Sequence, residues 1–161
     1  SHDNLIAIEK ALKVFREHDV DVIIHLGDII SPFALTKILE FPGKIVVVTG
    51  NNDGDILQLK EIATKGGAIL KQFAYVMTIA KRNMFLTHGY GSKEQTEDYV
   101  RGMAMTGLYD IVLYGHTHKV RVDKINNTLV INPGEVCGYL TGVQSVVILD
   151  LITLAYNMIK L

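Results

Sequence analysis

Short polar clusters rich in glycine follow four strand-like runs of this 161-residue chain, and a fifth cluster precedes a helical pattern. The clusters are Gly27-Asp28, Gly50-Asn51-Asn52-Asp53, Thr87-His88-Gly89, Gly115-His116-Thr117-His118 and Ser1-His2-Asp3-Asn4. In α/β sheets the carboxyl ends of the strands share one edge, where ligands bind. The converging side chains are Asp, Asn and His, whose oxygen and nitrogen atoms are donors for a divalent metal ion. No thiolate is among them, which disfavours a structural zinc finger.

Each cluster taken alone also has an ordinary structural interpretation. A Gly-Asp pair after a strand is usually a turn, and Asn51-Asn52-Asp53-Gly54 has the composition of a turn and helix cap. The pair His116 and His118 is more specific, because residues two apart in extended backbone point to the same side. The joint occurrence of the clusters favours a metal site. We assign neither His18, which ends a helical pattern, nor His25, which lies within a strand, to that site.

The first half of the chain alternates between strand and helix patterns. We expect helices over 5–16, 33–40 with Pro32 before it, and 55–65, and strands over 20–26 and 44–49. This β-α-β-α order is typical of a mostly parallel, buried sheet.

The second half contains mostly strands. We expect strands over 68–80, 84–87, 110–114, 120–125, 128–131 and 144–149, a last strand ending at Leu161, and one helix over 92–106. The pattern predicts two sheets packed face to face with helices outside, in one domain spanning residues 1–161.

Composition excludes several classes of protein. The chain is 48% hydrophobic and 20% charged, values of a globular protein, and its net charge of −1 argues against strong nucleic-acid binding. No apolar run is long enough to span a membrane, and no signal peptide is visible. The single cysteine, Cys137, favours a reducing compartment, and we expect a cytoplasmic protein.

Taken in chain order, from His2 to His118, the five clusters resemble the motifs of the calcineurin-like metallophosphoesterase superfamily. The pattern of that family runs Asp-x-His, Gly-Asp, Gly-Asn-His-Asp, His, Gly-His-x-His. The Asn132-Pro133-Gly134 turn and the chain length resemble its small archaeal and bacterial phosphodiesterase branch. The resemblance implies a four-layer α-β-β-α sandwich of two mixed sheets flanked by helices. It also implies hydrolysis of a small phosphodiester or nucleotide-like substrate by a hydroxide that bridges two metal ions.

The same resemblance assigns a role to individual residues. Asp28 would bridge the two metals, and His2 and His118 would bind the first. Asn51, His88 and His116 would bind the second metal and, with Asp28, make up the catalytic set. Manganese is the metal that the family favours, and the ligand types also suit Ni, Fe, Zn or Co.

Two departures from the family pattern stand out. The Asp of Asp-x-His is absent. Either it lies on a first strand upstream of Ser1, as we expect, or the chain is truncated and its first metal site is impaired. Asn52 occupies the position of a histidine thought to protonate the leaving group, which an amide cannot do. We therefore expect Asn52 to contact substrate and the enzyme to prefer good leaving groups, as in aryl or nucleotide diesters. Asp53 would then cap the next helix.

Some positions and functions stay open. Glu135, Cys137 and Tyr139 follow the Asn-Pro-Gly turn and either line the cleft or form a structured turn around a packed cysteine. Ser31 and Tyr90 lie near the motifs without a defined role. The alternative function is a phosphoesterase-fold scaffold for protein contacts, as in the retromer complex, and a homo-oligomer is also open. No Gly-rich phosphate loop supports nucleotide binding without turnover.

Overall fold

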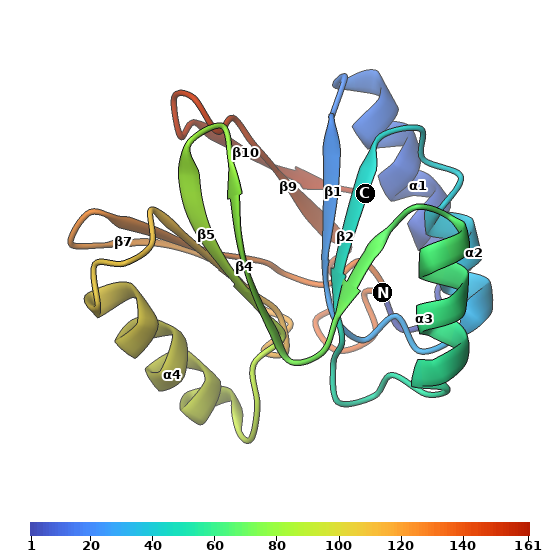
Figure 1. Cartoon of the computed structure of the whole chain (residues 1–161), viewed down its shortest axis with the longest axis horizontal. Helices are drawn as coiled ribbons and strands as arrows, with labels where there is room; N and C mark the ends of the chain where they lie inside the picture. The colour runs from blue at the N-terminus through green and yellow to red at the C-terminus, as the bar shows by residue number, and fades with distance from the viewer.

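The computed structural model describes all 161 residues, as four helices and ten strands (Figure 1). In chain order they are α1 (Leu5–Glu17), β1 (Val22–Leu26), α2 (Pro32–Ile38), β2 (Lys44–Val48), α3 (Ile56–Lys65), β3 (Ile69–Lys71), β4 (Ala74–Ile79), β5 (Arg82–Thr87), α4 (Lys93–Met105), β6 (Ile111–Tyr114), β7 (Val120–Ile125), β8 (Thr128–Pro133), β9 (Ser145–Leu149) and β10 (Tyr156–Lys160). Side chains of Asn4, Ser31, Asp55 and Ser92 cap the four helices. None of the helices combines the length and hydropathy needed to cross a bilayer.

The elements form four layers, as the sequence predicts. Helices α1 to α3 cover one side of a parallel sheet of order β1-β2-β3, and α4 covers the far side of a mixed sheet of order β4-β5-β6-β8-β7 (Figure 1). A separate antiparallel pair, β9 and β10, completes the strand layers.

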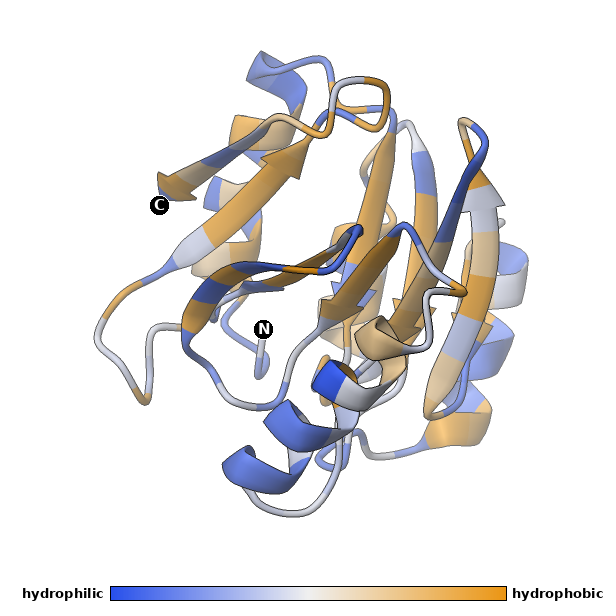
Figure 2. Ribbon diagram, turned by 90° about the vertical axis from the view of Figure 1, so that its left-hand side faces the viewer, coloured by the Kyte–Doolittle hydropathy of each residue, from blue (hydrophilic) through white to orange (hydrophobic).

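Three apolar clusters fill the three interfaces between these layers. Strand β2 is buried on both faces: Ile45 and Val47 pack toward the helices, and Val46 and Val48 pack between the sheets. Strand β5 repeats this alternation, with Phe85 in the cluster under α4. The near-continuous hydrophobic strands follow from burial on both faces, and Figure 2 shows them as orange arrows between bluer helices.

One expected strand is in fact two. The run 68–80 divides into β3, which pairs with β2 in parallel, and β4, which pairs with β5 antiparallel in the other sheet. The chain changes sheets at Gln72 and Phe73, and Phe73 has a positive φ of 61°. No glycine, proline or asparagine marks this bend, so a prediction from local composition does not separate the two strands.

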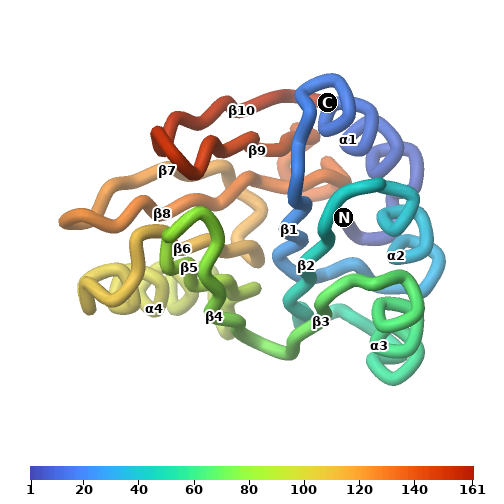
Figure 3. Tube along the Cα trace, turned by 45° about the horizontal axis from the view of Figure 1, so that its top comes forward, coloured from blue at the N-terminus to red at the C-terminus, as the bar shows by residue number.

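A cavity lies between β1 and β9. Strand β1 pairs only with β2, and β9 only with β10, so each has one edge without a strand partner. The cavity has a volume of about 700 Å³ and is lined by α1, β1 and β9 and by side chains such as Met84 and Ile131. Figure 3 shows β9 and β10 running past the end of β1.

Candidate metal centre

The five polar clusters meet at the carboxyl ends of β1, β2, β5 and β6. Gly27-Asp28 directly follows β1, Asn51 lies three residues after β2, His88 follows β5, and His116 and His118 lie just after β6. The fifth cluster, which precedes α1, lies beside these strand ends: the N–H of His2 donates to the carbonyl of Asp28 at 2.9 Å. The cavity between β1 and β9 opens onto this edge, since His2, Asp28, His88, His116 and His118 are among its lining residues.

Asp28 lies at the centre of the cluster. Its side chain is 4% exposed, and its Oδ2 atom lies 3.3 Å from His2 Nε2 and 3.4 Å from His88 Nε2. The backbone N–H and the side-chain amide of Asn52 donate to its two oxygens, each at 2.9 Å.

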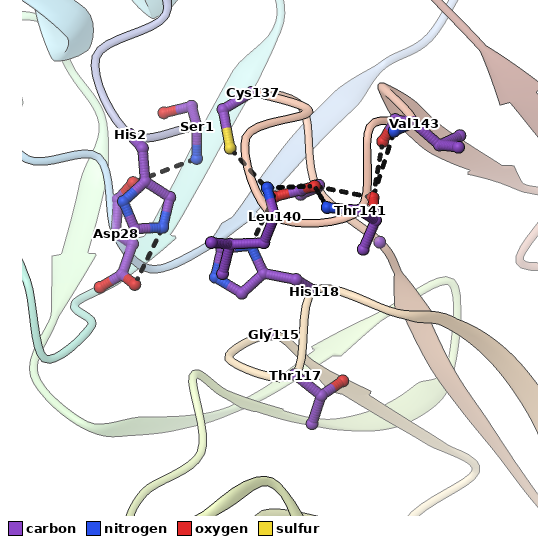
Figure 4. A network of polar contacts seen from close by, with 12 residues as sticks. Ser1, His2, Asp28, Gly115, Thr117, His118, Cys137, Leu140, Thr141 and Val143 are labelled. Atoms are coloured by element: carbon purple, nitrogen blue, oxygen red, sulfur yellow. Dashed lines mark hydrogen bonds and ion pairs between the residues drawn. The ribbon is translucent and has the colours of Figure 1, made fainter.

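One half of the cluster consists of His2, Asp28 and His118. One ligand atom of each lies within 4.8 Å of the other two, and the His2 and His118 rings are 5.0 Å apart (Figure 4). The Nε2 atom of His2 is buried and has no hydrogen-bond partner. Burial lowers the pKa of His2, which favours the neutral imidazole that a metal ion binds.

The other half consists of Asn51, His88 and His116. His88 Nε2 lies 3.0 Å from Asn51 Oδ1 and 3.2 Å from His116 Nδ1. The opposite ring nitrogens are fixed by the main chain: His88 Nδ1 donates to the carbonyl of Leu26 at 2.6 Å, and His116 Nε2 donates to that of Gly91 at 2.8 Å.

These outer hydrogen bonds decide which atoms the two rings present to each other. A neutral imidazole has one N–H, and here each N–H is directed to a carbonyl. His88 Nε2 and His116 Nδ1 therefore both present lone pairs, next to the oxygens of Asn51 and Asp28. Four acceptors this close repel one another unless a cation lies among them. The donor set fits a divalent metal ion on these grounds.

His118 is held by a carboxylate instead of a carbonyl. Its Nδ1 lies 2.6 Å from Oε2 of Glu135, whose side chain is 3% exposed, so its Nε2 is the atom free to face His2 and Asp28. Glu135 also accepts hydrogen bonds from Cys137 Sγ, Leu140 N, Thr141 N and Thr141 Oγ1 (Figure 4). Burial raises the pKa of Glu135, but the donors from Thr141, His118 and Cys137 outweigh it and lower the pKa to about 2.

Both open interpretations of this segment apply to Glu135, which lines the cavity and also holds the turn, whereas the packed turn alone describes Cys137. Glu135 collects the turn around itself, and Cys137 is 2% exposed, whereas Tyr139 is 64% exposed. The sequence marks Glu135 only as a carboxylate that follows Asn-Pro-Gly. Its role in orienting His118 is not visible there, because His118 lies 17 residues away along the chain.

The segment after β2 differs from expectation. Asp53 does not cap α3: it accepts hydrogen bonds from the backbone N–H groups of Ile30 and Gly50, each at 2.7 Å, and Asp55 is the cap. Asp53 thereby joins the loop that carries Asp28 to the loop that carries Asn51. The amide of Asn52 is directed at Asp28, and its contact with substrate stays a prediction.

Two glycines make the close approach of the clusters possible. A Cβ atom at Gly27 would collide with the His88 ring, and one at Gly50 would collide with the Asp28 carboxylate. His18 and His25 stay outside the cluster: His18 caps α1, and His25 is half-buried in β1 with Nε2 3.0 Å from the Ser1 hydroxyl.

The chain is similar to known phosphoesterases. Residues 1–153 match the family described as the calcineurin-like phosphoesterase superfamily domain. A curated phosphodiesterase of Methanocaldococcus jannaschii is 39% identical over 153 residues, which cover 93% of this chain and 88% of that protein. The phosphodiesterase YfcE of Escherichia coli is 24% identical over 148 residues, which cover 84% of this chain and 74% of that protein.

Solved structures agree with the sequence comparisons. The structure of a novel archaeal phosphodiesterase superposes with a TM-score of 0.91 and 36% identity, covering 99% of this chain and 94% of that one. Vps29 of Chaetomium thermophilum superposes with a TM-score of 0.68 at 14% identity, covering 94% and 85% of the two chains, and shares the fold alone.

Proposed function

Because this chain belongs to the calcineurin-like phosphoesterase superfamily and is a hydrolase of phosphoric esters, we propose that it is a phosphodiesterase that uses two divalent metal ions. The observation that carries the proposal is the convergence of ring lone pairs and oxygens around Asp28, which requires positive charge. The relatives named phosphodiesterases support the diester as substrate.

The two halves of the cluster would hold one ion each. His2 and His118 would bind the first, Asn51, His88 and His116 the second, and Asp28 would lie between them. When bound, two divalent ions lower the pKa of water and stabilise the charge on phosphoryl oxygens. Manganese is the ion that we propose from the family, and the nitrogen and oxygen donor set supports it as it supports other first-row metals.

The substrate that we propose is a small phosphodiester with a good leaving group. A poor leaving group would need a proton donor at the position of Asn52, and an amide does not supply a proton. A net charge of −1 gives no general attraction for a nucleic-acid backbone, so the bound cations would attract the phosphate. We propose that one domain over residues 1–161 carries this activity in the cytoplasm.

Metal reconstitution tests the proposal. The chain is stripped with a chelator, and bis(4-nitrophenyl) phosphate and an alkyl phosphomonoester are assayed while Mn²⁺, Ni²⁺, Fe²⁺, Zn²⁺ or Co²⁺ is added back singly. We expect turnover of the aryl diester that depends on the added metal, with Mn²⁺ among the activating ions, and far slower turnover of the monoester. Strong monoesterase activity that a change at His116 abolishes would contradict the leaving-group preference.

The alternative is a scaffold that keeps the fold without turnover. The three imidazoles His88, His116 and His118, each oriented by a partner on its outer nitrogen, favour the enzyme over the scaffold. Metal that binds stoichiometrically without turnover of any diester would favour the scaffold.

A further inference from the structure

Two exposed aromatic residues lie on loops that adjoin the segments carrying Asn51, His88 and His116. Phe73 is 52% exposed and Tyr90 is 48% exposed. Their ring centroids lie 6.4 Å apart, with the planes inclined at 49°. Exposed aromatic rings are common singly, but two that contact each other, on loops next to a proposed reactive site, offer a surface that a planar group can contact.

Phe73 is fixed between the two strand ends that carry Asn51 and His88. Its backbone N–H donates to Thr49 Oγ1 at 3.4 Å, and its carbonyl accepts from Thr87 Oγ1 at 3.2 Å. Thr49 and Thr87 directly precede Gly50 and His88. A phenylalanine with a φ of +61° is sterically unfavourable, and such a conformation persists only where the surroundings impose it.

The backbone of Tyr90, two residues after His88, is held by two hydrogen bonds. Its backbone N–H donates to Thr96 Oγ1 at 3.0 Å, and its carbonyl accepts from the same hydroxyl at 2.8 Å. The next carbonyl, that of Gly91, orients His116. Both exposed rings also lean on Tyr99, whose centroid lies 5.5 Å from that of Tyr90 and 6.2 Å from that of Phe73. The two rings therefore share a support on α4, and their backbones are tied to the segments that carry the histidines.

We propose that Phe73 and Tyr90 form an aromatic platform that stacks on a planar aromatic group esterified to the phosphate, such as an aryl group or a nucleobase. This proposal specifies the class of substrate for the same site, phosphodiesters with a planar aromatic group, and it rests on the proposed phosphodiesterase function. Stacking on an aromatic side chain is tolerant of the ring's identity, because every aromatic group offers a π face. It also places binding contacts on the ester group that leaves, away from the reacting phosphorus.

Binding of two phosphonates that differ only in their ring tests the platform. The Zn²⁺-loaded full chain is titrated calorimetrically with phenylphosphonate and with methylphosphonate, neither of which carries an ester to hydrolyse. We expect phenylphosphonate to bind at least about fivefold more tightly, and Phe73→Ala and Tyr90→Ala each to weaken it about five- to tenfold, as for loss of one stacked ring. Methylphosphonate affinity should change less than about twofold in both variants.

Two control variants separate stacking from folding. Tyr90→Phe keeps the ring and should bind phenylphosphonate as the unchanged chain does. Tyr156→Ala removes a ring of matched exposure, 49%, from β10 and should change neither affinity. Equal affinity of the unchanged chain for the two phosphonates, no binding of phenylphosphonate, or equal weakening of both by the alanine variants would each overturn the platform.

The platform and the proposed function fail separately. A chain that prefers phenylphosphonate, loses this preference in Phe73→Ala and Tyr90→Ala, and turns over no diester keeps the platform while the hydrolysis proposal fails. A chain that hydrolyses aryl and alkyl diesters of equal leaving-group pKa with the same KM, unaffected by either variant, keeps the hydrolysis proposal while the platform fails.

Discussion

The two halves of the site orient their imidazoles by different means. In the half around Asn51, main-chain carbonyls of Leu26 and Gly91 receive the outer N–H groups of His88 and His116. In the half around His2, the carboxylate of Glu135 receives the outer N–H of His118. A carbonyl orients a ring without adding charge, whereas a buried carboxylate also makes the ring a stronger base. The two sites should therefore differ in metal affinity and in sensitivity to side-chain changes.

Asp28→Asn should have the largest effect, because Asp28 is the one charged group close to both halves. An amide keeps the shape but removes the charge that balances two cations. We expect kcat/KM for bis(4-nitrophenyl) phosphate to fall about a thousandfold or more, corresponding to several kcal/mol of transition-state stabilisation. An unchanged circular dichroism spectrum shows that the fold remains. Turnover within tenfold of the original would remove Asp28 from the centre of the proposed site.

His116→Ala separates the two halves. It removes the ring that faces His88 and leaves His2, Asp28 and His118 in place. We expect one of two metal equivalents to be lost, measured by elemental analysis after gel filtration, and turnover to fall about a hundredfold or more. His18→Ala, at the exposed end of α1, is the matched control and should keep both equivalents. Retention of two equivalents by the His116 variant would contradict the assignment of ligands.

Glu135→Gln should weaken metal binding only in the half of the site that contains His118. The change removes the charge behind His118, and a glutamine side chain no longer accepts from all the donors of Leu140 and Thr141. We expect the affinity of one metal equivalent to fall about 10- to 100-fold, the effect typical of a partner behind a metal-binding histidine. Calorimetric titration of the metal-free chain gives both affinities. Glu97→Gln, on an exposed ion pair with Arg121, should change neither.

The smallest expected effect is on the stability of the metal-free chain at low pH. The pKa of Glu135 falls from 4.5 to about 2 on folding, so below about pH 4.5 the unfolded chain binds more protons than the folded one. The stabilisation is complete above about pH 5 and is lost as pH falls toward about 2. The free energy of unfolding in urea should decrease between these limits, and Glu135→Gln should make that decrease smaller by on the order of 1–2 kcal/mol. An identical pH dependence in the variant would contradict the role of this carboxylate.

Most of the elements were predictable because their signals are local. Helix periodicity and capping residues place α1, α3 and α4 within a few residues, and apolar runs place β1, β2 and β6. The missed bend at Gln72 and Phe73 has a physical reason. Its geometry is imposed by Thr49 and Thr87, which hold Phe73 from positions 24 and 14 residues away along the chain.

The sequence by itself determined the kinds of donor atoms, their order along the chain and the alternation of elements that sends them to one sheet edge, because these follow from residue type and short spacing. Only the tertiary structure decided which nitrogen each imidazole presents. His88 and its carbonyl partner Leu26 lie 62 residues apart, and His118 and Glu135 lie 17 apart. It also decided that the rings of Phe73 and Tyr90, 17 residues apart along the chain, lie next to each other. Hydrogen-bond partners and ring neighbours depend on packing between layers, and a local pattern does not contain that information.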